Sequence, residues 1–193
     1  MTALAQETAF EVGPEPYRFT IDAVLRMMST GVLQPDARVE LLDGEIIQMP
    51  AEGFPHKRFK GEIARYLNRT LSDDYFVAID STLRLSDENA PDPDVHVYYR
   101  EVREEALTAA DVLLVIEIAD SSISYDLNRK SRKYAQFGIE DYWVVDVNRR
   151  VTHVFRGAKD GVYLSRELRR FDQPLPALRI AEIVLTVSDL PVD

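Results

Sequence analysis

The first third of the chain carries the pattern of a short helix, a β-hairpin and a longer helix. Apolar residues recur at helical spacing from Thr20 to Met28, and the hydroxyl of Thr20 can cap the start of this segment. Two short apolar runs between Val39 and Met49 flank Asp43-Gly44, which predicts a tight hairpin turn. Helical spacing returns from His56 to Leu71, after a loop that contains proline and glycine.

The rest of the chain has the pattern of strands around one further helix. The predicted strands are Tyr75 to Leu85, Asp94 to Tyr99, Asp111 to Ile118, Tyr142 to Val147, and a hairpin from Val151 to Phe155 and Gly161 to Glu167. The apolar run from Val112 to Ile116 is typical of a central strand buried on both faces. A helix is predicted from Ser124 to Phe137, and Gly138 is placed to end it. Residues 101–110 predict a short polar helix or loop, and residues 175–190 an irregular segment with a short strand or helix.

This order of elements predicts an α/β fold, in which a central mixed β-sheet is flanked by α-helices and preceded by an N-terminal helix and β-hairpin. A length of 193 residues suits one ordinary domain. Residues 1–16 include Gly13, Pro14 and Pro16 and show no period, so we expect a flexible tail there. We expect residues 17–193 to form the single domain.

Composition excludes several classes of protein. The chain has no cysteine, which excludes disulfide scaffolds, thiol nucleophiles and metal sites built on Cys ligands. No apolar stretch approaches about 18 residues, so we expect no membrane span. Residues 1–10 lack the features of a signal peptide, so we expect a cytoplasmic protein. Lys and Arg number 23 against 33 Asp and Glu, and this net charge of −10 argues against a broad, non-specific nucleic-acid coat but not against a local basic strip.

Three charged residues break the local pattern and are the candidates for chemistry. Asp94 opens a strand directly after a Pro-Asp-Pro segment, and Glu117 interrupts the end of the most apolar strand. On a helical wheel each residue advances by about 100° around the helix axis. Measured from Leu127, Lys130 lies at about 300°, inside an apolar stripe that also contains Tyr134. An inward lysine needs a carboxylate partner, and Glu117 is the natural candidate.

Two carboxylates on adjacent strands with a lysine beside them suit a metal-dependent attack on a phosphodiester. Hard oxygen ligands such as Asp94 and Glu117 hold Mg²⁺ or Mn²⁺, which polarises the phosphodiester and lowers the pKa of a bound water. Lys130 would orient or deprotonate that water and offset the developing charge. The alternative is structural, because acids are common at strand ends and Lys130 could reach past the stripe to solvent.

Beyond these three residues, several short motifs follow one another in a specific order. They are Glu40-Leu-Leu-Asp-Gly-Glu-Ile46, His56 at a helix start, Pro93-Asp-Val95, Leu114-Val-Ile-Glu-Ile118, Asp126-Leu-x-x-Lys130-x-x-x-Tyr134-Ala135 and Gly138-Ile-x-x-Tyr-Trp-Val-Val-Asp146. Together they resemble the Uma-type restriction endonuclease family, which has the PD-(D/E)XK nuclease fold. The resemblance runs from Tyr17 to Leu190 and implies a restriction endonuclease-like core.

The resemblance implies a role for each matching residue. Asp94 and Glu117 would be metal ligands, and Glu40 would add a ligand or hold a metal-bound water. The lysine expected two residues after the second acid is absent, because that position is Ala119. The family pattern instead carries a lysine on the next helix, which here is Lys130.

Two further positions would support the site, and one stretch departs from the family. His56 and Tyr134 match family positions and would have supporting roles. The family usually has Ser-Pro after the acidic strand, where this chain has Ala119-Asp120-Ser121-Ser122. Asp120 either adds negative charge that alters metal binding or faces solvent.

Several of the remaining residues also allow a purely structural interpretation. Glu40 could instead be a solvent-facing strand residue, and the role of His56 could be limited to stabilising the start of a helix. His96 shares a strand face with Asp94 and could approach a metal, but a packed histidine is the simpler expectation. We expect His153 at the surface.

The aromatic pair and the basic runs complete the set of candidates. Tyr142 and Trp143 are expected in the core. Basic residues cluster in residues 129–133 and in residues 57–60. These two runs either contact phosphates beside the cleft or form solvated helix faces.

The sequence therefore predicts a Mg²⁺- or Mn²⁺-dependent endonuclease that hydrolyses DNA, with Asp94, Glu117, Lys130 and Glu40 in catalysis. A homodimer is expected from the resemblance, since nucleases of this fold often act as dimers. One alternative is an inactive nuclease-fold protein that binds a partner or nucleic acid, which Ala119 and the negative net charge favour. The other is a metal-dependent phosphohydrolase that acts on other nucleic acids or nucleotides.

Overall fold

The computed structural model describes residues 15–34 and 36–192, so nearly all of the tail expected for residues 1–16 lies outside the described residues. The helices are α1 (Ile21–Ser29), α2 (Phe54–Thr70), α3 (Ile123–Tyr125), the π-helical turn η3 (Asp126–Lys130), α4 (Ser131–Gln136), and the 3₁₀ turns η1 (Glu104–Ala106), η2 (Ala109–Asp111) and η4 (Val187–Asp189). The strands are β1 (Val39–Leu42), β2 (Glu45–Gln48), β3 (Tyr75–Ile79), β4 (Val95–Tyr99), β5 (Val112–Ala119), β6 (Asp141–Asp146), β7 (Val151–Lys159), β8 (Val162–Arg170), β9 (Leu175–Pro176) and β10 (Val184–Leu185).

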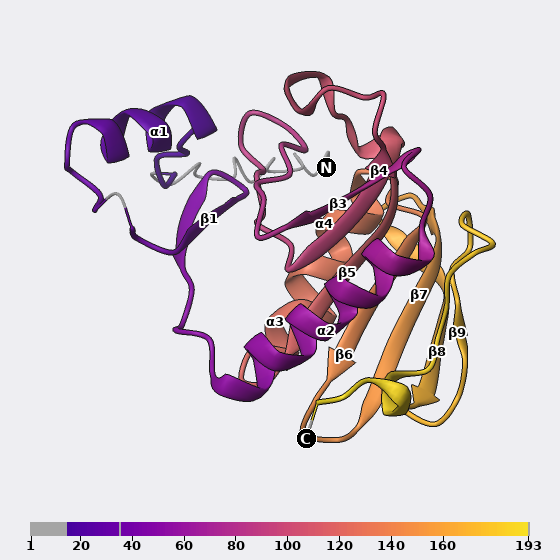
Figure 1. Cartoon of the computed structure of the whole chain (residues 1–193). Helices are drawn as coiled ribbons and strands as arrows, with labels where there is room; N and C mark the ends of the chain where they lie inside the picture. Colours follow the sequence, from indigo (N-terminus) through magenta and orange to yellow (C-terminus); the bar gives the residue numbers. More distant parts are fainter. Residues whose placement is uncertain (1–14, 35, 193) are drawn as a thin grey trace, which may run out of the picture.

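A six-stranded sheet with the order β3-β4-β5-β6-β7-β8 forms the centre of the molecule (Figure 1). Only β5 and β6 run parallel, and the chain passes between them through α3, η3 and α4; the other neighbours are antiparallel. All eight residues of β5 are buried, which explains its continuous apolar run. The predicted α/β class with a mixed central sheet is confirmed.

Side chains of β5 alternate between two separately covered faces of the sheet. Ile116 and Ile118 pack with α2 and with the C-terminal segment of residues 175–190. Val115 and Ala119 point the other way and pack with α4 through Tyr134. Figure 1 shows α2 in front of the sheet and α4 behind it. Because alternation is strict in a strand, Glu117 lies on the α4 face.

The N-terminal helix and hairpin form a smaller unit beside the sheet (Figure 1). The hydroxyl of Thr20 accepts a hydrogen bond from the amide of Ala23 and caps α1, as its position in the sequence indicates. Asp43 and Gly44 turn the hairpin with φ of 55° and 68°, the left-handed values that an Asp-Gly turn favours. A short bridge from Leu41 to Ala90 joins the hairpin to the loop before β4.

Three local predictions differ from the structure. The strand expected from Tyr75 to Leu85 ends at Ile79, because Asp80 takes a left-handed φ of 49° and turns the chain. The helix expected to be regular from Ser124 to Phe137 contains the η3 turn. His153 is buried and not at the surface, because neighbouring side chains cover its ring, among them Arg166 with its Nη2 at 3.2 Å from Nδ1.

Candidate active site

Asp94 and Glu117 face each other across the β4–β5 pair. Val95 pairs with Ile116 in an antiparallel register, so the preceding Asp94 comes opposite Glu117. The amide of Asp94 donates to Glu117 Oε2 at 3.4 Å, and the amide of Ile118 donates to Asp94 Oδ2 at 2.7 Å. Both carboxylates are buried, and the strand register fixes their separation.

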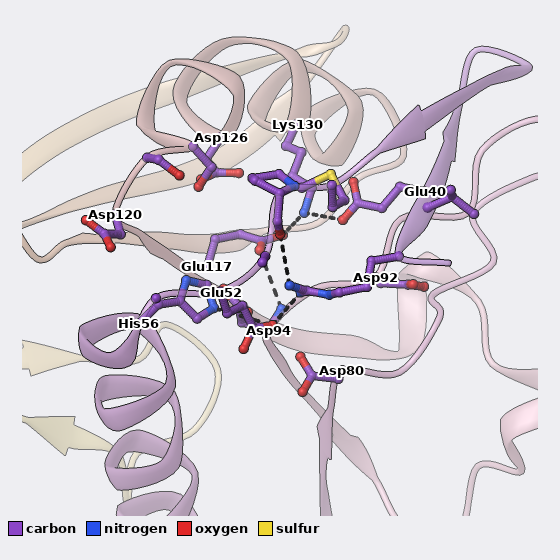
Figure 2. Close-up of a pocket in the computed structure, with 18 of the residues that line it drawn as sticks. Glu40, Glu52, His56, Asp80, Asp92, Asp94, Glu117, Asp120, Asp126 and Lys130 are labelled. Atoms are coloured by element: carbon purple, nitrogen blue, oxygen red, sulfur yellow. Dashed lines mark hydrogen bonds and ion pairs between the residues drawn. The ribbon is translucent and has the colours of Figure 1, made fainter. Parts of the chain in front are cut away.

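Lys130 reaches into the sheet and lies between two carboxylates (Figure 2). Its Nζ is 2.7 Å from Glu40 Oε1 and 2.8 Å from Glu117 Oε1. The hydroxyl of Tyr134 donates to the same Glu117 oxygen at 2.9 Å. The inward direction predicted for Lys130 is confirmed, and its carboxylate partners are Glu117 and also Glu40.

The π-helical turn η3 presents two buried charged residues to this region. A π turn adds about one residue to a helical turn, and such turns are common at functional sites. Asp126 and Lys130, at the two ends of η3, are each 2% exposed. Asp126 accepts a hydrogen bond from the hydroxyl of Ser122 at 2.6 Å, and its carbonyl accepts one from Tyr142. The sequence interpretation did not single out Asp126 as a site residue.

Glu40 belongs to the hairpin and is buried, which excludes its alternative as a solvent-facing strand residue. Tyr125 donates a hydrogen bond to Glu40 Oε2 at 3.3 Å. Ion pairs fasten the hairpin to the helix that carries Lys130: Arg129 binds Glu45 at 2.6 Å, and Lys133 binds Asp43. Two cations of the predicted basic run therefore position Glu40.

A second group of polar residues lies on the α2 side of Asp94 (Figure 2). His56 Nε2 is 2.8 Å from Asp94 Oδ1, and Glu52 lies in the loop that leads into α2. Lys60 Nζ is 2.8 Å from Glu52 Oε1 and 2.6 Å from Asp80 Oδ1. Glu52 and Asp80 were missed from sequence, and Lys60 was considered only as part of the basic run of residues 57–60, although it is buried. A signal existed for Lys60, which lies four residues after His56 and therefore on the same helix face.

Burial and pairing set the charge states of the central groups. Burial alone would lower the pKa of Lys130, but the carboxylates of Glu117 and Glu40 raise it well above its ordinary value. Burial raises the pKa of Glu117, although Lys130 opposes this. Burial would also raise the pKa of Asp94, but the hydrogen bonds from His56 and Ile118 hold it below its usual range. Lys130 is therefore an ammonium ion and Asp94 a carboxylate at neutral pH.

One cavity of about 460 Å³ brings the two groups together, and its lining includes Asp94, Glu117 and Lys130 as well as Glu52 and His56. Its acidic side chains, which far outnumber Arg38 and Lys130, are Asp36, Glu40, Glu52, Asp80, Asp92, Asp94, Glu117, Asp120 and Asp126. Within the described residues, one group of side chains offers three potential ligand atoms within 4.8 Å of one another, from Glu52, His56 and Asp94. Carboxylate oxygens and an imidazole suit a divalent cation. The donor set of this cavity thus fits a metal ion.

The other residues that the sequence singled out lie away from this cavity. His96 is buried, stacks on Tyr98, and leaves its Nδ1 without a hydrogen-bond partner among the described residues. Burial lowers the pKa of His96 to about 4. Tyr142 and Trp143 are fully buried in the core, as predicted.

A comparison with protein-family models matches residues 22–188 to the Uma2 model, which is described as "Putative restriction endonuclease". The chain belongs to the Uma2 family. The sequence resemblance is thereby confirmed, and Asp94, Glu117 and Lys130 of this Uma2 protein lie inside the matched range. None of the curated proteins matches the sequence.

One solved structure shares the fold of this chain. A crystal structure of "a putative nuclease belonging to DUF820" from Anabaena variabilis superposes with a TM-score of 0.71. The two sequences are 18% identical, and the match covers 89% of this chain and 96% of the other. A DrdV–DNA complex matches with a TM-score of 0.34 and 10% identity over 59% of this chain and 12% of that one, which is too low to indicate a common fold. In the described part of this Uma2 protein, no helix is long and apolar enough to cross a membrane.

Proposed function

We propose that the protein is a metal-dependent endonuclease that hydrolyses phosphodiester bonds of DNA. The observation that carries the proposal is the buried Lys130 ammonium between Glu40 and Glu117, next to Asp94 at the wall of an acidic cavity. Membership of the Uma2 family supports hydrolysis of a nucleic acid as the reaction class. DNA as the substrate, a homodimer as the active form and a cytoplasmic location rest on the sequence resemblance and composition alone.

Each residue has a role in this proposal. Asp94 and Glu117 would hold Mg²⁺ or Mn²⁺, which when bound supplies Lewis acidity and lowers the pKa of water. Lys130, whose ammonium the Glu117 and Glu40 carboxylates favour, would orient the attacking water and offset negative charge on the phosphate. Glu40 positions Lys130, and His56 positions Asp94 through its hydrogen bond.

Nicking of supercoiled plasmid in Mg²⁺ tests the proposal. Asp94→Asn and Glu117→Gln remove a ligand charge while keeping the side-chain shape, and each should lower the nicking rate by at least about 100-fold. Glu105→Gln, on the exposed η1 turn, removes an equal charge away from the cavity and should nick like the wild type. Wild-type rates in both Asp94→Asn and Glu117→Gln would overturn the assignment.

A non-catalytic binding protein is the second candidate, and one observation favours it. Glu117 Oε1 is already bonded to both Lys130 and Tyr134, so this carboxylate is less available to a metal than its position implies. Calorimetric titration with Mg²⁺ separates the candidates, because an active site should bind the ion and Glu117→Gln should abolish that binding. Comparing plasmid, short single strands and free nucleotides as substrates tests the third candidate, a nucleotide phosphohydrolase.

A further inference from the structure

The group on the α2 side of Asp94 has the geometry of a metal site in its own right. His56 Nε2 lies 2.8 Å from Asp94 Oδ1 and 3.9 Å from Glu52 Oε1. A divalent ion with bonds of about 2.1 Å keeps adjacent ligand atoms about 3 Å apart and opposite ones about 4 Å apart. The three atoms therefore need only small shifts to surround one ion.

Lys60 contacts the same two oxygen atoms that would complete this site. Its Nζ is 2.8 Å from Glu52 Oε1 and 3.6 Å from Asp94 Oδ1, and its side chain is 8% exposed. Asp80 also binds Nζ, with distances of 2.6 and 2.8 Å to its two oxygens. An ammonium group thus occupies the position from which a metal ion would reach Glu52 and Asp94, and Asp80 offers it another partner.

We propose that Glu52, His56 and Asp94 bind a first-row transition-metal ion such as Mn²⁺, and that the ammonium of Lys60 covers their oxygens until the ion displaces it. An imidazole ligand favours a transition metal over Mg²⁺, which prefers oxygen ligands. In the metal-free protein Nε2 donates a hydrogen bond to the Asp94 carboxylate, so binding of the ion requires Nε2 to lose that proton. In the metal-bound state His56 binds through the Nε2 lone pair, and the ring proton resides on Nδ1. Lys60 keeps its two contacts with Asp80 as it leaves. This site rests on the proposed function only through Asp94, which both would use.

The nitrogen ligand gives the site a spectroscopic signature that the all-oxygen pair of Asp94 and Glu117 lacks. Mn²⁺ added to metal-free wild-type protein should show ¹⁴N coupling in electron spin-echo envelope modulation. His56→Asn should lose this coupling and bind Mn²⁺ at least about tenfold more weakly. Glu117→Gln leaves the three ligands in place and should keep the coupling.

Lys60 gives a second and opposite test. Lys60→Met removes the competing ammonium, so the protein should bind Mn²⁺ more tightly, on the order of tenfold. This is the size of effect that substitutions of residues contacting metal ligands usually have on metal affinity. Lys57→Met, exposed on the same helix, removes an equal charge without touching the group and should bind Mn²⁺ like the wild type. Lys60→Gln, which keeps hydrogen-bonding capacity, takes the place of Lys60→Met if the latter does not fold.

The outcomes separate this site from the proposed activity. Bound Mn²⁺ without ¹⁴N coupling in the wild type, or unchanged affinity in Lys60→Met and Lys60→Gln, overturns the inference whatever the nuclease activity. A wild-type protein that shows the coupling but does not nick plasmid overturns the proposed function and supports this site.

Discussion

Single residues decide the chemistry of the cavity, and sequence reveals them where they violate the pattern of their element. Glu117 and Lys130 were predictable because each is a charge in an apolar strand or stripe, and burying such a charge requires a partner. Glu52, Asp80 and Asp126 were not predictable, because acids in loops and at helix starts are ordinary. Of the three, Asp126 is buried, Glu52 is half-buried and Asp80 is exposed, and only the folded chain brings them to the lining of one cavity.

The burial of the Asp92 carboxyl makes the stability of the protein depend on pH. Burial raises the pKa of Asp92 to about 6 from an ordinary value of 3.8. Between these values the folded protein binds more protons than the unfolded chain, so the free energy of unfolding falls as pH rises through this window. Asp92→Asn removes this effect. The free energy of unfolding of the variant minus that of the wild type should therefore increase by about 2 kcal/mol between about pH 4 and about pH 8. Urea unfolding in EDTA measures this difference.

Asp172 supplies the control for this prediction. It is exposed, and Arg170 lowers its pKa, so Asp172→Asn should show no gain relative to the wild type as pH rises. An Asp92→Asn variant whose relative stability does not change with pH would contradict the burial of that carboxyl.

At the scale of elements, turn and helix glycines give predictions of opposite sign. Gly44 has a φ of 68°, and a Cβ there would lie 2.6 Å from Arg18 Cβ, so Gly44→Ala should destabilise the protein by about 1–3 kcal/mol. Gly61 lies inside α2 with nothing within 4 Å of an added Cβ, so Gly61→Ala should stabilise it by about 0.5–1 kcal/mol. Thermal unfolding midpoints that shift in the same direction would refute this comparison.

The elements themselves were largely predictable, and their exceptions have local causes. The Asp-Gly turn, the Thr20 cap and the buried strand β5 follow from short-range chemistry. Periodicity gave no warning of η3, because a π turn shifts the phase of a helix by one residue without altering its composition. The sequence order also could not show that the hairpin packs against α4, since this contact depends on Arg129 and Lys133 meeting acids more than eighty residues away.

At the scale of the whole molecule, acidity governs how a polyanion can approach. The net charge is −10, and acidic residues dominate the lining of the cavity. Cations bound there would reduce the repulsion of phosphates. DNA affinity measured by fluorescence anisotropy in Ca²⁺ should therefore fall by about tenfold when K⁺ replaces Ca²⁺ at equal ionic strength. Equal affinity in the two salts would place the DNA contacts outside the cavity.

The two walls of the cavity differ in how they are built, and this gives them different mechanical stiffness. Asp94 and Glu117 are fixed by strands in the middle of a six-stranded sheet, where opening requires breaking the core. Glu40 belongs to a two-stranded hairpin that ion pairs from Arg129 and Lys133 hold in place. Ion pairs near a surface weaken in salt, whereas packed strands do not. The wall formed by the sheet is therefore rigid, whereas the position of the wall formed by the hairpin depends on the ionic strength of the solution.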